Sequence, residues 1–326
     1  MFITGLLTIF TLLMAGSGPA GRPVSRYPIV DSAGPRDRIL IVAPHIDDEV
    51  IGAGGYAANA IRNGAQLYVV FLTAGDCNRF SARILHRTLE PTANNYLEVG
   101  RTRIAEARSA MARLGVPPDH YFILGYPDGG LRAIYDHPNA IVKSRSTGEL
   151  SVPYSEALSP GSPYSMEHLS DDLLRVVEIS APTVVIAPVP FDMHPDHSAA
   201  AEITDSVLIA SHRNPKRLGY LIHTSRIPKS FVWFPERSLA PPPRFENYAW
   251  ATYPLTPRMQ QEKDGVLLMY KSQRPYVFLL RNAYIRKNEL FFIYDWTTAP
   301  KQKAESTRQK EGPSSLWPLH ALNDGR

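Results

Sequence analysis

The sequence predicts an α/β fold: a Rossmann-like three-layer sandwich with a mostly parallel sheet, followed by an irregular, β-containing C-terminal extension. Short apolar runs rich in β-branched residues alternate with longer helical patterns, which implies parallel strands joined by helical crossovers. The chain has 326 residues, of which 44% are hydrophobic, so it can bury a large core. These observations exclude disordered, collagen-like and coiled-coil proteins.

The first half of the chain contains three of the expected strands. Residues 38–43 (RILIVA) predict a buried strand because they are few, apolar and preceded by turn residues. Residues 52–63 are rich in small side chains and predict a helix, and residues 66–73 (QLYVVFLT) predict a second buried strand. A helix at 102–114 and a third strand at 121–124 complete this half.

The same alternation then repeats. Residues 167–179 are expected to be helical, residues 183–187 (TVVIA) to form a strand, and residues 198–211 to form a helix. Residues 218–223 close the series as another strand. All strands of this series are expected to lie in one sheet that is covered on both faces.

The C-terminal third departs from the alternation. Residues 230–257 are aromatic and rich in proline, which predicts an irregular surface segment placed to line a substrate cleft. A helix is expected at 259–272 and two short strands within 276–295. Two insertions, 78–100 and 134–164, interrupt the βα pattern, and loops of that length are usually functional or mobile.

A single domain is expected at residues 36–295, with a polar, flexible tail at 296–326. Cys77 is the only cysteine, which excludes an intramolecular disulfide and any zinc site built on several thiolates. Lys and Arg number 35 and Asp and Glu number 31, mixed along the chain without a long basic run, so we expect no nucleic-acid partner. The sequence carries no signal of an oligomeric state.

Residues 1–21 have the layout of a secretory signal peptide. They carry no charged side chain, and the apolar stretch 3–15 is followed by small residues. We therefore expect a secreted or extracytoplasmic protein that is cleaved near residues 15–21, with an uncleaved N-terminal membrane anchor as the alternative. The apolar stretch is shorter than the ~20 residues needed to span a bilayer, and no later segment is longer, so no other membrane span is expected.

Two clusters of histidine and acidic residues follow predicted strands. The segment PHIDDE (44–49) comes after strand 38–43, and HPDH (194–197) comes after strand 183–187. In open parallel sheets ligands bind at the carboxyl ends of the strands, so the two clusters are expected to meet there. Imidazoles and carboxylates are the ligands of a catalytic zinc that keeps one position open for water.

Both clusters match motifs of a known family. Its first motif, AHPDDE, appears as PHIDDE at 44–49, and its second, HPDH, appears unchanged at 194–197. Weaker matches are TAGD at 73–76, an R-x-x-E pattern that begins at Arg103, and GYPDGGL at 125–131. The sequence thus resembles the PIG-L/LmbE-type zinc-dependent N-acetylglucosaminyl deacetylases.

The resemblance covers about residues 38–273 and includes two departures from the family pattern. Ile46 replaces the usual proline, which loosens the turn without removing a ligand. Asp76 stands where a glutamate is common and is one methylene shorter, which is expected to alter substrate contacts. The family's chemistry-bearing residues are otherwise present, so an active enzyme is expected.

The resemblance implies a hydrolase that removes the N-acetyl group from an N-acetylglucosamine-containing glycoconjugate or glycan and releases acetate. By motif position, His45, Asp48 and His197 would bind one Zn²⁺, or another divalent metal, per chain. Asp47 would be the general base that takes a proton from water, and His194 would stabilise the oxyanion. Either Asp47 or His194 would protonate the departing amine.

Supporting roles follow from the same resemblance. Asp196 would bind the far nitrogen of His194 and favour the imidazolium form. Asp128 would bind a sugar hydroxyl, although a turn residue is a comparable interpretation. Glu49 is expected to face a helix dipole, and His223, like the other histidines outside the two motifs, is assigned no role.

Other functions compete with this interpretation. A dinucleotide-binding oxidoreductase is disfavoured because the acidic residues 47–49 would crowd a pyrophosphate. A metal-dependent phosphoesterase commonly seats two metals, whereas one complete ligand set is evident. A secreted carbohydrate-binding protein without catalysis would use the aromatic stretch 231–253 and leave both motifs unexplained.

Overall fold

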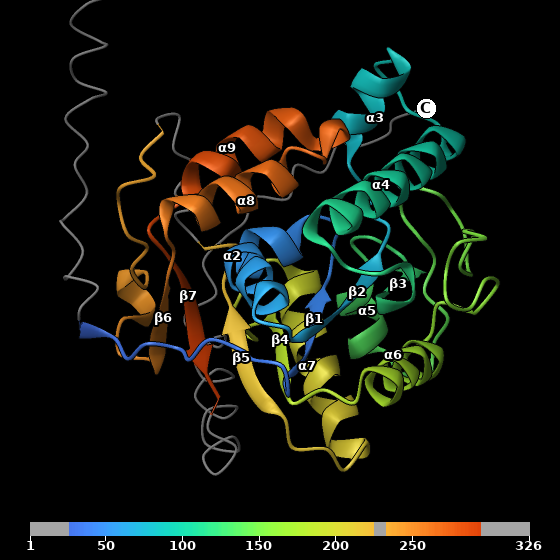
Figure 1. Ribbon diagram of the computed structural model, residues 1–326. Coiled ribbons are helices and arrows are strands. Elements are labelled where there is room, and N and C mark those ends of the chain that lie inside the picture. Colours follow the sequence, from blue (N-terminus) through green and yellow to red (C-terminus); the bar gives the residue numbers. More distant parts are fainter. Residues whose placement is uncertain (1–25, 225–232, 295–326) are drawn as a thin grey trace, which may run out of the picture.

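The computed structural model describes residues 26–224 and 233–294, which build a seven-stranded sheet between two layers of helices (Figure 1). The strand order within this part of the chain is β3-β2-β1-β4-β5-β7-β6. The strands are β1 (Arg38–Ala43), β2 (Gln66–Thr73), β3 (Tyr121–Tyr126), β4 (Val184–Pro188), β5 (Lys216–Tyr220), β6 (Trp250–Pro254) and β7 (Asn288–Ile293). The predicted signal segment, 1–21, and tail, 296–326, lie outside the described residues.

The predicted parallel sheet is confirmed for its first five strands. β1 pairs in parallel with β2 on one side and with β4 on the other, and β4 pairs in parallel with β5. β7 is antiparallel to β5, and β6 is antiparallel to β7, so the C-terminal strands extend the sheet as a β-containing edge. The chain order reverses between β1 and β4, which makes their carboxyl ends the switch point where ligands bind in such sheets.

Helices cover both faces of the sheet (Figure 1). One face carries α2, α4, α8 and α9, and the other carries α5, α6 and α7. Their bounds are α2 (Asp48–Arg62), α3 (Arg79–His86), α4 (Ala93–Leu114), α5 (Leu131–Asp136), α6 (Met166–Ser180), α7 (Pro195–Ala210), α8 (Pro257–Leu267) and α9 (Arg274–Tyr284). Short 3₁₀ turns occupy Pro118–His120, Pro243–Phe245 and Lys271–Gln273.

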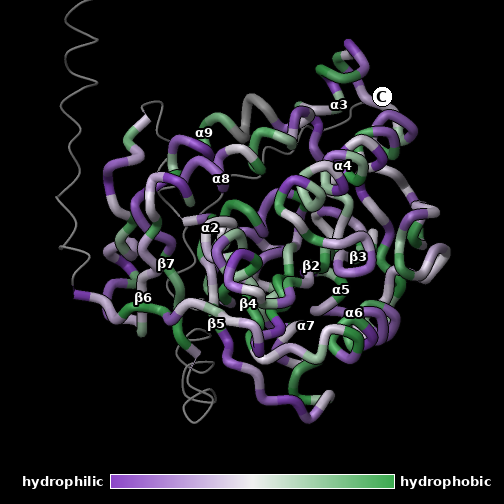
Figure 2. The backbone as a smooth tube through the Cα atoms, viewed as in Figure 1, coloured by the Kyte–Doolittle hydropathy of each residue, from purple (hydrophilic) through white to green (hydrophobic). Residues whose placement is uncertain are grey.

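The core lies on both faces of the central strands. Residues Ile39–Ala43 of β1 are fully buried, as are most residues of β2 and β4. A strand that is covered on both faces must be apolar at every position, which is why these segments lack polar alternation. Figure 2 shows the hydrophobic strands inside and hydrophilic stretches along the outer helices.

The C-terminal prediction is wrong at two points. Residues 274–284 form helix α9, where a strand was expected to begin at residue 276. The aromatic and β-branched residues there favour strands, but β propensity yields to packing, and a proline stands in the first turn, where helices accept it. Residues 250–254, expected to be irregular, form strand β6.

The two insertions are ordered and packed. The first contains α3 and the first turns of α4, which begins with a capping box at Thr92 and Asn95. The second buries Val152, Tyr154 and Tyr164 against the core. In the part of the chain that the structure describes, no helix combines the length and apolarity required to cross a membrane.

Candidate active site

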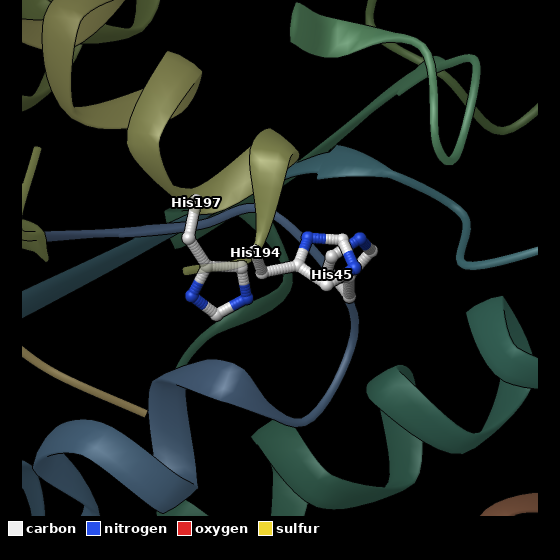
Figure 3. Close-up of side chains that lie close together, drawn as sticks. All are labelled: His45, His194 and His197. Atoms are coloured by element: carbon white, nitrogen blue, oxygen red, sulfur yellow. The ribbon is translucent and has the colours of Figure 1, made fainter. Parts of the chain in front are cut away.

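The two predicted clusters meet at the carboxyl edge of the sheet. His45 follows β1 and His197 lies in the first turn of α7, which follows β4. The imidazoles of His45, His194 and His197 come together there (Figure 3), each offering a nitrogen within 4.8 Å of the others. Residues about 150 positions apart in the sequence thus become neighbours because β1 and β4 pair directly.

Asp48 joins the two outer histidines. Its Oδ2 atom lies 3.2 Å from Nδ1 of His45 and 3.1 Å from Nε2 of His197. The backbone N–H of His45 donates to the same oxygen at 2.9 Å. Burial alone would raise the pKa of Asp48, but His197 and His45 outweigh it and hold that pKa well below its usual range. The carboxylate is therefore ionised between two imidazoles.

His197 is fully buried and has unsatisfied ring nitrogens. Among the described residues, neither Nδ1 nor Nε2 has a partner in hydrogen-bonding geometry. Burial lowers the pKa of His197, but the carboxylates of Asp48 and Asp192 raise it to about 9. An unpartnered buried imidazole next to an ionised carboxylate fits a cation site, because a metal ion would satisfy both groups.

Asp47 adopts a strained backbone conformation just before α2. Its φ of 121° is one that L-residues rarely adopt, and such strain is common at active sites. The Glu49 carboxylate accepts the Asp47 N–H at 3.1 Å, and Arg103 Nη2 lies 3.5 Å from Asp47 Oδ2. Arg103 also donates to the carbonyls of Gly75 and Ile46, so it ties this turn to the loop after β2.

Gly75 makes the approach of Arg103 possible. Its φ is +65°, and a Cβ atom at this position would stand 2.2 Å from Nη1 of Arg103. Any side chain at residue 75 would therefore displace the guanidinium that pairs with Asp47. Gly75 is the glycine of the TAGD match at 73–76, so this part of the motif reflects the close packing of Arg103 against the backbone.

The carboxyl groups on either side of Asp48, those of Asp47 and Glu49, have raised pKa values. Burial raises the pKa of Asp47 to about 7, against the opposing effect of Arg103. Burial raises the pKa of Glu49 to about 8, against the hydrogen bond from Tyr270. Glu49 lies in the first turn of α2, as the sequence predicts, and its side chain is buried and accepts the Tyr270 hydroxyl.

The predicted contact between Asp196 and His194 is also wrong. The Asp196 carboxylate accepts the backbone N–H groups of Gly129 and Leu131, at 2.7 and 3.1 Å, and does not reach the His194 ring. Instead, the backbone N–H of Asp196 donates to Nδ1 of His194 at 3.3 Å. Burial and the neighbouring His45 lower the pKa of His194 to about 3, so the ring is neutral and carries its proton on Nε2.

Asp128 lies in the same site. Its Oδ1 is 3.2 Å from Nε2 of His45, and its Oδ2 accepts the N–H of Cys77 at 2.8 Å. Burial would raise the pKa of Asp128, but His45 lowers it to about 2. The sequence brings Asp128 to this edge because its loop follows β3, a third parallel strand.

A pocket of about 380 Å³ opens over these groups. It is lined by His45, Asp47, Asp48, Cys77, Asn78, Arg79, Arg103, Asp128, His194, Ile222, His223, Gln273 and Leu280. None of the described aromatic residues of 230–257 lines it, so the predicted cleft role of that segment is wrong for those residues. Asp76 does not line it either, because its carboxylate accepts the hydroxyls of Tyr154 and Ser146 inside the protein.

Sequence reasoning missed two residues of the site. Asp192 is buried, with its Oδ2 3.3 Å from Nδ1 of His197, and His223 lies beside it and lines the pocket. Both follow a strand at the carboxyl edge, β4 for Asp192 and β5 for His223. Their position after these strands is the signal that points to both, although neither belongs to a recognisable sequence motif.

Comparisons with known proteins agree with this geometry. The family model described as "PIG-L: GlcNAc-PI de-N-acetylase" matches residues 40–208. A 1D-myo-inositol 2-acetamido-2-deoxy-alpha-D-glucopyranoside deacetylase of Actinosynnema mirum is 32% identical over 181 residues, which cover 53% of this chain and 56% of that protein. The match thus spans about half the length of that relative.

Two solved structures share the fold. N,N'-diacetylchitobiose deacetylase from Pyrococcus horikoshii aligns with a TM-score of 0.50 and 17% identity, over 82% of this chain and 89% of its own. A deacetylase of the teicoplanin biosynthesis pathway aligns with a TM-score of 0.51 and 16% identity, over 78% of this chain and 96% of its own. At these identities the likeness concerns the arrangement of strands and helices.

Proposed function

The chain belongs to the PIG-L family, and from this membership we propose that it is a zinc-dependent hydrolase that removes the N-acetyl group from an N-acetylglucosamine-containing substrate and releases acetate. One observation carries the proposal: Asp48 Oδ2, which lines the pocket, lies within 3.2 Å of a nitrogen of both His45 and His197. The named relatives act on acetamido sugars, which supports the substrate class.

His45, Asp48 and His197 are the residues that would hold the metal. Two imidazoles and one carboxylate are a common catalytic zinc set, and the unpartnered Nε2 of His197 supports their fit to a cation. When bound in such a site, zinc polarises a carbonyl oxygen and lowers the pKa of water toward ~7.

Asp47 is the proposed general base. Its carboxylate lines the pocket beside Asp48, so it can accept the proton of the attacking water at Oδ1 or Oδ2. A pKa raised to about 7 by burial gives this carboxylate more proton affinity than an ordinary aspartate near neutral pH. Arg103 and Glu49 hold the strained turn, so that the base stays in place.

His194 is the proposed donor to the developing oxyanion. Because its Nδ1 accepts the N–H of Asp196, its proton stands on Nε2 and is available to the acetamide oxygen. This donor acts as neutral imidazole, in place of the imidazolium expected from the sequence. Asp128, an ionised residue that lines the same pocket, is proposed to accept a hydrogen bond from a sugar hydroxyl.

Metal content and acetate release test this function together. The full-length purified chain, reconstituted with zinc, should hold one zinc per chain, and His197→Ala should hold none. His137→Ala, at an exposed histidine remote from the pocket, is the matched control. The parent should release acetate from N-acetylglucosamine conjugates and no phosphate from phosphomonoesters. A zinc-free parent, or phosphate release without acetate, would contradict the proposal.

We also propose that residues 1–21 direct export, so that the enzyme meets an extracellular or envelope glycan. The uncharged apolar stretch 3–15 and the small residues that follow it support this. Mass spectrometry of the protein from a secreting host should find a new N-terminus near residues 15–21. An intact Met1 in the membrane fraction would favour the anchored form instead.

A further inference from the structure

Asp192 is a fully buried carboxylate that the backbone fixes from two loops. Its Oδ1 accepts the N–H of His194 at 2.8 Å, in the loop between β4 and α7. Its Oδ2 accepts the N–H groups of Ile222 and His223, both at 3.1 Å, in the segment after β5. Both oxygens of Asp192 thus accept hydrogen bonds from the main chain. Asp192 is therefore an acceptor whose position is set by main-chain atoms.

Two imidazoles face this acceptor. Nδ1 of His197 lies 3.3 Å from Oδ2, and Nδ1 of His223 lies 3.4 Å from Oδ1. Both Nδ1 atoms are buried and make no hydrogen bond of standard geometry among the described residues, so the Asp192 oxygens are the charged groups that they face. Because both oxygens of Asp192 act as acceptors, a ring nitrogen that faces one of them must carry a hydrogen. When the ring is neutral, as a metal-ligating histidine is, this contact selects the Nδ1–H tautomer and leaves the lone pair on Nε2.

The Nε2 lone pairs of His197 and His223 lie in different surroundings, which suits them to different functions. Nε2 of His197 lies 3.1 Å from Asp48 Oδ2, on the side where a metal ion would need a lone pair. The His223 ring lines the pocket with 15% of its side chain exposed, while its Nδ1 edge is buried against Asp192. Its ring centre lies 4.9 Å from that of His194. His194 offers a donor at Nε2, so the pocket wall pairs a donor imidazole with an acceptor imidazole.

We propose that Asp192 is a positioning residue that fixes the tautomers of His197 and His223 together, and that His223 binds substrate by accepting a hydrogen bond at Nε2. Its hydrogen-bond donor would be a hydroxyl or amide N–H group of an amino sugar. That group would lie next to the acetamide oxygen to which His194 donates. The role of His223 rests on the proposed function, whereas the role of Asp192 concerns metal affinity and tautomer and holds without it.

Three variants of the full-length chain test the inference. Asp192→Asn removes the charge and one acceptor, and His223→Leu removes the acceptor in the pocket while keeping an apolar side chain of similar volume. Asp172→Asn is the matched control. Asp172, in α6, is also a buried carboxylate, but it accepts the hydroxyls of Tyr126 and Ser159 and does not line the pocket. Circular dichroism and thermal unfolding establish that each variant is folded.

Zinc affinity, measured by competition with a chromogenic chelator, is the first readout. Asp192→Asn should weaken it about 10- to 100-fold, the usual effect of removing the partner of a ligating histidine. Asp172→Asn and His223→Leu should stay within about twofold of the parent. An unchanged affinity in folded Asp192→Asn, or an equal loss in His223→Leu, overturns the assignment of Asp192.

Nitrogen-15 NMR of histidine-labelled protein is the second readout. The zinc-loaded parent should show the Nδ1–H form for His197 and His223, assigned from the variants, and zinc-loaded Asp192→Asn should lose it. If Asp192→Asn does not fold, the spectrum of the zinc-loaded parent alone decides: an Nε2–H form of either ring contradicts the proposal.

Steady-state kinetics test the role of His223. His223→Leu should raise KM for the acetamido sugar about tenfold, since one hydrogen bond is lost, with zinc affinity unchanged. An unchanged KM contradicts this role. A chain that hydrolyses no acetamido sugar contradicts the proposed function, while the zinc and NMR readouts still decide the assignment of Asp192.

Discussion

Asp47 combines a strained backbone with a buried carboxylate, and both properties depend on its neighbours. A positive φ in a non-glycine residue costs on the order of 1–3 kcal/mol, which the contacts of Glu49 and Arg103 offset. The raised pKa of Asp47 has burial as its main cause. The residues around Asp47 thus set both the orientation and the basicity of its carboxylate.

Replacing Asp47 by asparagine should separate catalysis from metal binding. Asp47→Asn keeps the shape of the side chain but cannot accept a proton, so kcat should fall about 10²- to 10⁴-fold, the usual contribution of a general base. Zinc content should stay at the parent level. Asp48→Ala, in contrast, should lose both metal and activity. Full turnover by Asp47→Asn would contradict the base assignment.

Asp76 should make stability depend on pH. Burial, and then the nearby Asp128, raise its pKa from 3.8 to about 7, although Tyr154 and Ser146 donate to it. The folded chain therefore holds the proton better than the unfolded chain. The stability that this group contributes is complete below pH 3.8 and is lost as the pH rises to about 7.

Asp76→Asn should remove that dependence, because a neutral amide resembles the protonated acid. Between pH 5 and pH 8, the free energy of unfolding of the variant should gain about 2–3 kcal/mol on that of the parent, at 1.36 kcal/mol per pKa unit. Urea denaturation at the two pH values measures this. A constant difference between variant and parent would show that Asp76 is ionised throughout.

At the scale of elements, helix α2 is interrupted and capped from another part of the chain. Ala53 has non-helical angles (φ −146°, ψ 15°), so the helix restarts after it. The N–H groups of Gly55 and Tyr56 donate to Glu289 of β7 at 2.7 and 2.8 Å. Glu289 also pairs at 2.8 Å with Lys263 of α8. A strand residue thus caps a helix that carries two residues of the site.

Removing Glu289 should be strongly destabilising. Glu289→Ala leaves the ammonium of Lys263 buried without its counter-charge, which typically costs about 3–5 kcal/mol. Lys263→Met combined with Glu289→Ala should recover part of this loss, because no buried charge remains. Urea denaturation of the two single variants and the double variant measures the coupling. Strictly additive losses would exclude an energetic link between the pair.

At the scale of the molecule, metal binding should stabilise the fold. A ligand that binds only the folded chain adds about 2.7 kcal/mol at a hundredfold excess over its dissociation constant, which should raise Tm on the order of 5 °C. Differential scanning calorimetry with and without zinc should show this rise in the parent and in His137→Ala. His197→Ala should show none. A shift of equal size in His197→Ala would place the metal elsewhere.

The sequence was sufficient to predict the parallel sheet and the meeting of the two motifs. Strands buried on both faces read as continuous apolar runs, and their carboxyl ends share one edge, so His45 and His197 could be placed together. The sequence was insufficient to predict side-chain burial and orientation that depend on tertiary contacts. Glu49 is buried against Tyr270, a residue that is distant from it in the sequence. The Asp196 carboxylate is oriented by backbone amides of the loop after β3.

The direct pairing of β1 with β4 also has a consequence for the order of events during synthesis. A ribosome completes His45 and Asp48 some 150 residues before His197, so a nascent chain that ends before β4 carries half a site. The second half joins only when β4 adds to the edge of β1, after two intervening strands and five α-helices have been made. Metal uptake by the proposed site is therefore expected only after β4 has been made, and a chain truncated before β4 should bind zinc more weakly than the whole protein.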